Sequence, residues 1–274
     1  MKDIYDKISF KVSKLTTTAY STSFSLGIRV FNKRFHDPVY AVYGFVRLAD
    51  EIVDTFHAYD KERLLGEFKK STYQAISDGI SLNPILNSFQ HVVNKYGIER
   101  ELIDTFLHSM EMDLYKKNYD QYGYETYILG SAEVVGLMCL RVFLEGDDVK
   151  YHELKDNAKS LGSAFQKINF LRDLGADYKT LGRTYFPGID LTKFDHNERN
   201  TIEQDIEKDF IHGYEGIKKL PVTVRKGVYI AYLYYYSLFN KIKNSSTTSL
   251  LNQRMRIHNF KKYWLIIVAY VKFK

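Results

Sequence analysis

Two amides and two carboxylates recur at helical spacing within residues 161–187. Gln166, Asn169, Asp173 and Asp177 stand at positions i, i+3, i+7 and i+11. At about 3.6 residues per turn these side chains share one face of a helix, within roughly 80° of arc. Large apolar residues that need burial of their own are interleaved with them: Phe165, Ile168, Phe170 and Leu171. Since a buried carboxylate must be paired or bind a cation, we expect this acidic stripe to face a cavity.

A second acidic stripe lies earlier in the chain, between residues 38 and 56. Arg47, Asp50 and Asp54 fall on one helical face at i, i+3 and i+7, and Glu51 stands beside them. An exposed ladder of ion pairs would explain an isolated pattern of this kind. Here, however, apolar residues surround the stripe: Val42, Phe45, Val46, Ile52 and Val53. The composition therefore favours a largely buried helix whose carboxylates point inward.

Carboxylates one turn apart on two facing helices could hold Mg²⁺, a hard cation that takes oxygen ligands. Two or three such ions would clamp a diphosphate and neutralise the charge that develops as it leaves carbon. Arg47 and Arg172 are suitable donors for phosphate oxygens. These residues together predict metal-assisted chemistry on a diphosphate.

The helices that must position these residues can be read from apolar periodicity. The chain has four prolines, each at the start or end of an apolar-periodic segment. Apolar residues recur at i, i+3, i+4 and i+7 nearly throughout, and no alternating run predicts a sheet. The predicted helices are 3–19, 39–57, 60–79, 85–96, 99–117, 124–145, 150–178, 201–219, 222–243 and 255–271. Since no linker or repeat divides the chain, we predict one all-α domain over residues 1–274.

Composition limits the function further. The 274 residues carry a net charge of +6, with Lys and Arg interleaved with Asp and Glu. No basic stripe marks a nucleic-acid face, so the charge suits an anionic ligand or an anionic membrane surface. The 23 Tyr and 18 Phe indicate either biased codon usage or an aromatic cavity.

Compartment is inferred from cysteine usage and apolar runs. Cys139 is the single cysteine, which excludes an intrachain disulfide and favours a reducing compartment. No signal peptide is visible, and the late apolar run 263–271 is too short to span a bilayer. We expect a cytoplasmic protein.

The small hydroxyl residues of segment 20–25 allow two interpretations. A turn with capping serines is the simpler one. Hydroxyls and backbone N–H groups at such a junction can also hold phosphate oxygens.

Three motifs together resemble the squalene/phytoene synthase family. They are Asp50-Glu-Ile-Val-Asp54, the segment from Gln166 to Asp177, and the loop Gly182-Arg-Thr-Tyr-Phe-Pro187. The resemblance runs from Ser21 to the last predicted helix. It implies the all-α isoprenoid synthase fold, in which a single helical bundle surrounds a central hydrophobic channel.

The resemblance assigns roles to both acidic stripes. Asp50, Glu51 and Asp54 would bind metal on one side of the channel, with Arg47 as a phosphate contact. Asn169, Asp173 and Asp177 would bind metal on the other side, with Gln166 and Arg172 beside them. Asp50, Asp54, Asp173 and Asp177 would thereby be catalytic.

Further positions match residues that contact substrate in the family. Ser21, Ser23 and Phe24 match a segment that lies against a diphosphate, which favours the phosphate-holding interpretation of that turn. Tyr43 and Tyr127 match site tyrosines, Tyr127 as a catalytic residue. Tyr236 and Arg254 resemble a late tyrosine and arginine near a diphosphate.

Aromatic faces would stabilise carbocations in such a channel, and the candidates are Phe24, Tyr43, Tyr127 and Phe165. The sequence departs from the family at Leu129, Glu133 and Tyr20. The differences at Leu129 and Glu133 put the preference for substrate chain length in doubt. A solvent-facing or ion-paired acid is the simpler interpretation of Glu133.

The implied activity is that of phytoene synthase: two geranylgeranyl diphosphates condense through a cyclopropylcarbinyl diphosphate. The alternative within the class is a squalene or dehydrosqualene synthase that uses farnesyl diphosphate. The alternative outside it is a helical protein that binds lipid or a partner. Two or three Mg²⁺ ions are expected, with Mn²⁺ as an alternative ion, and NADPH is not expected.

The partners are then prenyl diphosphates, with no nucleic acid, and the oligomeric state stays open. The basic and apolar segment 254–274 predicts peripheral contact with the inner membrane face. Packing of the last helix on the core is an equal alternative.

Overall fold

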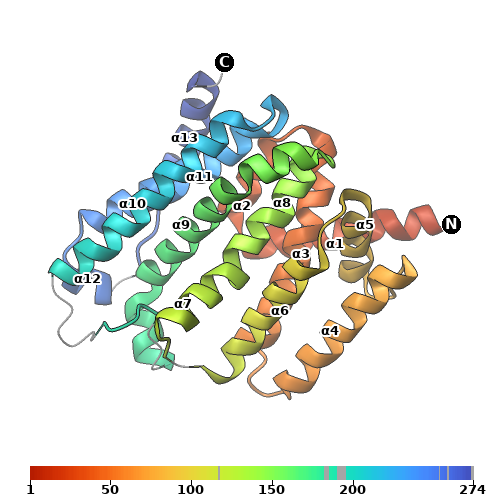
Figure 1. The fold of residues 1–274 in the computed structure, drawn as a ribbon, viewed down its shortest axis with the longest axis horizontal. Coiled ribbons are helices and arrows are strands. Elements are labelled where there is room, and N and C mark those ends of the chain that lie inside the picture. Colours follow the sequence, from red (N-terminus) through yellow and green to blue (C-terminus); the bar gives the residue numbers. More distant parts are fainter. Residues whose placement is uncertain (117, 182–184, 190–195, 253, 258, 273–274) are drawn as a thin grey trace.

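A computed structural model describes residues 1–116, 118–181, 185–189, 196–252, 254–257 and 259–272. Within helices, the side chains of residues 22–23, 176–181, 196 and 259–263 are also outside the description. In these described ranges the chain forms helices joined by short loops, with no strand among them. The predicted all-α fold is confirmed, and Figure 1 shows the helices in their order along the chain.

The first half of the chain forms one side of the bundle. Its elements are α1 (Lys2–Tyr20), α2 (Thr22–Val30), the short 3₁₀-helix η1 (Lys33–Phe35), α3 (His36–Asp54), α4 (Lys61–Asp78), α5 (Pro84–Tyr96) and α6 (Arg100–Tyr115). α1 crosses α3 and α5, and α3 also packs against α6 and α8. The carboxylates of α3 are therefore carried by a helix that is enclosed on several sides.

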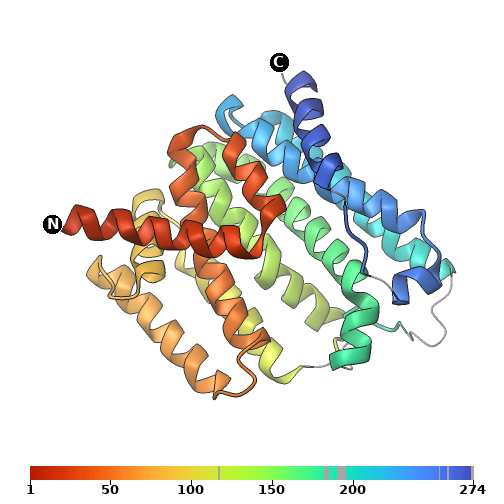
Figure 2. The same cartoon turned by 180° about the vertical axis from the view of Figure 1, so that it is seen from behind.

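The second half begins with a continuous helical stretch in three parts: α7 (Gln121–Ile128), a π-helical turn η2 (Leu129–Glu133) and α8 (Val134–Leu144). It continues with α9 (Asp148–Leu181), α10 (His196–Lys219), α11 (Val222–Lys243), α12 (Thr247–Asn252) and α13 (Asn259–Lys272). Figures 1 and 2 show α9 running through the middle of the molecule. It packs against α8, η2 and α10, which encloses much of the helix that carries the second acidic stripe.

Two α-helices, besides the three-residue η1, were not predicted. α2 covers residues that we interpreted as a turn, and Ser21 is its N-cap, accepting a hydrogen bond from the backbone N–H of Phe24 at 3.3 Å. The capping interpretation of Ser21 is thus confirmed. α12 falls in a Ser/Thr-rich segment whose six residues are too few to show apolar periodicity.

Aromatic side chains fill the core on both sides of α9. In the first half Phe45 stacks on Phe89 with ring centroids 3.9 Å apart. In the second half Phe210 lies among Tyr232, Tyr236 and Phe239. The high aromatic content therefore serves the core as well as the cavity described below.

Some helices meet backbone to backbone, which only glycine allows. A Cβ atom at Gly227 of α11 would lie 2.2 Å from the ring of Phe31 and 2.7 Å from the carbonyl oxygen of Gly27 in α2. A Cβ atom at Gly162 of α9 would lie 2.7 Å from the carbonyl oxygen of Ala132. Real Cβ atoms do not approach other atoms so closely, so these glycines set the spacing between the helices.

One described stretch, Gln121–Leu144, is long and apolar enough to cross a membrane. Its most apolar window is 72% buried inside the protein. A core helix passes the same test, and the packing of α8 against α9 and α6 accounts for its apolar character.

Candidate active site

A cavity of about 390 Å³ lies between α1–α3 on one side and η2, α8, α9, α10 and α11 on the other. Its lining on α9 extends from Leu154 to Asn169, which at about 1.5 Å per residue corresponds to a depth of about 22 Å. Arg47, Asp50, Gln166 and Asn169 line its polar end. Leu154 and Phe143 line the far end, beside the short connection from α8 to α9. One end of each predicted stripe thus reaches the same hollow, whereas Glu51, Asp54 and Asp173 are not among the residues that line it.

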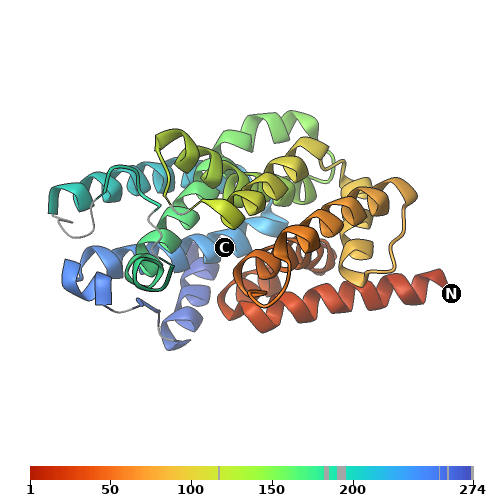
Figure 3. The same ribbon diagram turned by 90° about the horizontal axis from the view of Figure 1, so that it is seen from below.

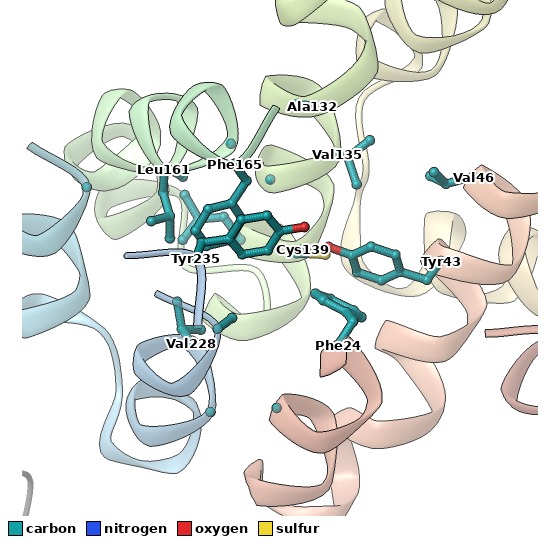
Figure 4. Close-up of a pocket in the computed structure, with 18 of the residues that line it drawn as sticks. Phe24, Tyr43, Val46, Ala132, Val135, Cys139, Leu161, Phe165, Val228 and Tyr235 are labelled. Atoms are coloured by element: carbon teal, nitrogen blue, oxygen red, sulfur yellow. The ribbon is translucent and has the colours of Figure 1, made fainter. Parts of the chain in front are cut away.

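Aromatic side chains project into this cavity from opposite walls (Figure 4). Phe24 and Tyr43 form a close ring pair with centroids 3.7 Å apart, and Phe165 stacks on Tyr235 at 4.0 Å. Cys139 lies between the two pairs, beside the Tyr43 hydroxyl. Burial raises the pKa of Tyr43 well above its ordinary value and that of the Cys139 thiol to about 12. Both groups are therefore neutral in an environment that excludes water.

Arg47 organises the acidic group on α3. Its guanidinium forms ion pairs with Asp50 and Glu51 and lies over the ring of Tyr20, 4.1 Å from the centroid. Its Nε is buried with no hydrogen-bond partner among the described residues. An N–H donor that is left over at the polar end can be satisfied by an incoming phosphate oxygen.

Asp50 is held in an unfavourable setting for a carboxylate. Burial, together with the neighbouring charge of Asp54, raises its pKa to about 7, although Arg47 acts in the opposite direction. The charge of Asp113 on α6 adds to the effect. Crowded, desolvated carboxylates of this kind are stabilised by a cation.

Glu51, one residue further on, behaves in the opposite way. Burial disfavours its ionised form, but hydrogen bonds from Thr55 and Arg47 outweigh burial and hold its pKa below the ordinary value. Glu51 is therefore the better compensated of the two carboxylates that Arg47 contacts.

The stripe on α9 continues the polar end. The Asn169 amide nitrogen lies 3.4 Å from the Gln166 side-chain oxygen, and Asn169 Oδ1 is buried without a hydrogen-bond partner in the described part of the chain. Asp173, one turn further, accepts bidentate contacts from Arg172 at 3.0 and 2.6 Å. Arg254 contacts the same carboxylate at 2.7 Å. Arg172, predicted beside this stripe, and Arg254, predicted near a diphosphate, thus both contact the Asp173 carboxylate.

The fit to a metal ion can be tested on these atoms. The unpartnered oxygen of Asn169 and the crowded carboxylate of Asp50 are the hard oxygen donors that Mg²⁺ prefers. Among the described residues no three Asp, Glu, His or Cys side chains form a compact metal cluster. The predicted ligand Asp177 lies outside the described side chains, as does the predicted substrate contact Ser23. The donor types present fit Mg²⁺.

Tyr127 does not line this cavity. It lies in a cluster of aromatic rings with Tyr119, Phe170 and Tyr185, and its hydroxyl donates to Asp113 at 2.7 Å. Because Asp113 acts on Asp50 electrostatically, Tyr127 is linked to the α3 carboxylates through one buried acid. Asp113 belongs to no motif, so the sequence offered no signal for it.

The structure places Tyr236 away from the cavity, contrary to our expectation. Its hydroxyl donates to Glu207 on α10 at 2.8 Å. The preceding residue, Tyr235, lines the cavity instead and lies close to Asn169 and Arg172. Neighbouring residues on a helix point about 100° apart, so a shift of one residue in a weak motif selects the wrong tyrosine.

Two of the three positions that depart from the family motif delimit the π-helical turn. η2 begins at Leu129 and ends at Glu133, and Ser131 and Ala132 between them line the cavity. Glu133 pairs with Lys159 at 3.4 Å, so the ion-paired interpretation of this acid is confirmed. π-helical turns are frequent at functional sites, and this one forms part of the cavity wall.

Comparison with known proteins agrees with this geometry. A sequence model of the squalene/phytoene synthase family matches residues 17–261. The phytoene synthase of Arthrospira platensis is 24% identical, over 96% of this chain and 93% of that protein. The 4,4'-diapophytoene synthase of Staphylococcus haemolyticus is 23% identical, over 81% of this chain and 76% of that protein.

Solved structures share the fold. A dehydrosqualene synthase in complex with ligand superposes with a TM-score of 0.83 at 22% identity, covering 97% of this chain and 98% of that one. A squalene synthase from Alicyclobacillus acidocaldarius superposes with a TM-score of 0.76 at 20% identity, covering 88% and 95%. The predicted isoprenoid synthase fold is thereby confirmed.

Proposed function

The chain belongs to the squalene/phytoene synthase family, and we propose that it is a phytoene synthase, which joins two geranylgeranyl diphosphates head to head. The family is one of prenyltransferase-type synthases, so the protein is an enzyme of that type. Phytoene synthases stand among its relatives at 22–25% identity, which supports the substrate but leaves it a proposal.

One observation carries the proposal: the cavity combines a polar end with a long apolar interior. Arg47 and Asp50 of α3 meet Gln166 and Asn169 of α9 at the polar end, and aromatic and aliphatic side chains line the rest. A prenyl diphosphate has the same division into an anionic head and an apolar tail. We place the diphosphate at the polar end and the isoprenoid chain along α9.

The chemistry proceeds in two stages. The C1–O bond of one diphosphate breaks, and its electron pair leaves with pyrophosphate. The double bond of the second molecule attacks the resulting allylic cation, and a proton is lost as the cyclopropane closes. The second C–O bond then breaks, the carbon skeleton rearranges, and loss of another proton gives the hydrocarbon. Two pyrophosphates and two protons are released in all.

The residues act on charge and water. Arg47 and Arg172 bind phosphate oxygens. To do so, Arg47 gives up its present contacts with Asp50 and Glu51. The ring faces of Phe24, Tyr43, Phe165 and Tyr235 stabilise the cations and exclude water from them. The departing pyrophosphate accepts the protons.

Mg²⁺ is part of the proposal. Asp50, Glu51, Asp54, Asn169, Asp173 and Asp177 would hold two or three ions, which would supply charge neutralisation to the leaving pyrophosphate. Mn²⁺, with the same preference for oxygen, would substitute.

A second candidate is dehydrosqualene synthase, which uses two farnesyl diphosphates. The observation in its favour is the close superposition on a dehydrosqualene synthase, together with the diapophytoene synthase among the relatives. The same site chemistry applies, and only the length of the apolar chain differs.

The test supplies farnesyl and geranylgeranyl diphosphates separately, with and without NADPH, and identifies the hydrocarbon by mass. We expect Mg²⁺-dependent pyrophosphate release and phytoene from the C20 substrate without NADPH. Asp173→Ala should abolish release, whereas Asp78→Ala on the surface of α4 should not. Release from neither substrate would overturn the enzyme assignment, and a C30 product alone would replace the first candidate with the second.

A further inference from the structure

The N-terminal helix α1 is amphipathic in an unusual sense, because its small polar residues face inward. Ser9, Ser13 and Thr17 are at most 4% exposed, where α1 crosses α3 and α5. The Ser13 hydroxyl lies 2.7 Å from that of Ser88. Their small size lets α1 approach closely: a Cβ atom at Gly44 of α3 would lie 2.8 Å from the Ser13 hydroxyl. The buried residues of α1 are therefore hydroxyl residues, with half-buried Phe10 and Val12 packed against the core beside them.

Three large apolar residues of α1 are exposed instead. Ile4, Ile8 and Leu15 are 62%, 47% and 69% exposed. At i, i+4 and i+11 they fall within roughly 40° of arc on one side of the helix. Three exposed lysines flank them on the same side: Lys7, Lys11 and Lys14. We refer to these six residues as the outer face of α1.

The C-terminal end of α1 reaches the cavity. Tyr20, the last residue of α1, and Ser21 line the cavity at its polar end, and Tyr20 is 54% exposed. Figures 2 and 3 place α1 and α13 on the same face of the molecule. α13 also exposes apolar side chains, with Trp264, Ile267 and Val271 at 54%, 61% and 67%. Exposed apolar residues thus occur on two helices of this face.

We propose that the outer face of α1 docks on an anionic lipid bilayer, with Ile4, Ile8 and Leu15 inserted between head groups and the lysines on lipid phosphates. A helix with an apolar stripe flanked by lysines lies in the membrane interface. The sequence predicted contact through segment 254–274, and this proposal adds the N-terminal helix to that contact.

Charge argues for lipid over a second copy of the chain. A symmetric contact between two outer faces would bring six lysines together, at a cost from like-charge repulsion. Anionic phosphates compensate the same charges, and the net charge of +6 acts in the same direction. Docking would hold the cavity entrance at the bilayer, so apolar chains need not cross water. Only this benefit of docking, and not the docking itself, rests on the proposed function.

The test is co-sedimentation of the full chain, without substrate, with vesicles of phosphatidylcholine alone or mixed with phosphatidylglycerol. We expect binding to the mixed vesicles that weakens with salt. The triple variant Lys7→Gln/Lys11→Gln/Lys14→Gln should bind about 100-fold more weakly, at roughly fivefold per lysine. Ile4→Gln/Ile8→Gln/Leu15→Gln should also lose binding.

Matched variants test whether a change in vesicle binding comes from the outer face of α1 itself. Val149→Gln, at an 80% exposed position on α9, should bind as the wild type does. Because Cys139 is the single cysteine and is buried, Leu15→Cys can carry an environment-sensitive dye whose emission should shift on mixed vesicles. The same dye at Val149→Cys should not shift.

Either triple variant should release pyrophosphate in detergent at the wild-type rate, so a failure of catalysis is distinguishable from a failure of docking. Absence of wild-type binding, or binding by both triple variants that equals binding by the wild type, would overturn the proposal. A wild-type dimer that Ile8→Gln separates, with no effect on vesicles, would assign the outer face to a second copy.

Discussion

Asp50→Asn should stabilise the protein in metal-free buffer at pH 8 while it abolishes activity. The pKa of Asp50 is raised from 3.8 to about 7 by burial and by Asp54. Since the ionised carboxylate is disfavoured in the folded state, the neutral amide of similar shape removes the penalty. The prediction thus concerns the stability of the protein before it meets any ion.

The magnitude follows from the pKa difference. The step from 3.8 to about 7 is about 3 pH units, which at 1.36 kcal/mol per unit sets an upper limit of roughly 4 kcal/mol. The Asp50 side chain is 33% exposed, so solvent screening reduces the expected gain to about 1–2 kcal/mol. At about 2–4 °C per kcal/mol for a protein of this size, the melting temperature should rise by a few degrees.

The pH dependence gives the sign. Between pH 4 and 7 the unfolded chain has lost the Asp50 proton while the folded chain still binds it, so this group lowers stability as pH rises. The penalty is complete above pH 7. The advantage of Asp50→Asn over the wild type should therefore be largest at pH 8 and should shrink towards pH 4.

The assay is denaturant unfolding in chelator across this pH range, with Glu51→Gln as the matched control. Glu51 shares Arg47 with Asp50, but its pKa is lowered. Its charge therefore contributes stability above the unfolded pKa, and that contribution is lost as pH falls through the folded pKa. Glu51→Gln should destabilise at pH 8. If Asp50→Asn is less stable than the wild type at pH 8, or if its advantage grows as pH falls, the reasoning is wrong.

Three further predictions concern the glycine contacts between helices, the hydrogen bond of Tyr127 and the far end of the cavity. Gly227→Ala should destabilise the protein by about 1–3 kcal/mol through overpacking. Gly66→Ala, with open space around its Cβ, should stabilise it by up to about 1 kcal/mol. Denaturant unfolding compares the two variants, and equal effects would contradict the claim that Gly227 sets the spacing between helices. Tyr127→Phe removes the 2.7 Å hydrogen bond to Asp113 and should cost about 1–3 kcal/mol; an unchanged unfolding midpoint would refute its role. Phe143→Ala should open the far end of the cavity and raise the share of the longer hydrocarbon product when C15 and C20 substrates compete. An unchanged product ratio would show that Phe143 does not limit the chain length of the substrate.

Both acidic stripes could be predicted because helical spacing and apolar flanks act over short distances. Arg47 and Asp50 face the same cavity as Gln166 and Asn169, although 115 and more residues separate them. Periodicity predicted which way each helix face turns. The resemblance to a known family supplied the fact that the two faces meet.

Contacts that depend on tertiary packing were beyond the sequence. Asp113 reaches the site from α6, where nothing in its surroundings distinguishes it from an ordinary acid. Tyr235 replaces Tyr236 because the rotation of α11 is set by its neighbours. The hydroxyl face of α1 was hidden because hydroxyl residues usually indicate the solvent side.

The close approaches at Gly27, Gly162 and Gly227 decide how the cavity can change. Where helices touch through main-chain atoms, the bore is fixed by the positions of their axes, and trimming a side chain there cannot enlarge it. Substitutions at these contacts therefore cannot broaden the cavity, although trimming Phe143 can lengthen it at its far end. Beside the glycine contacts, the cavity should accept longer substrates more readily than branched or bulkier ones.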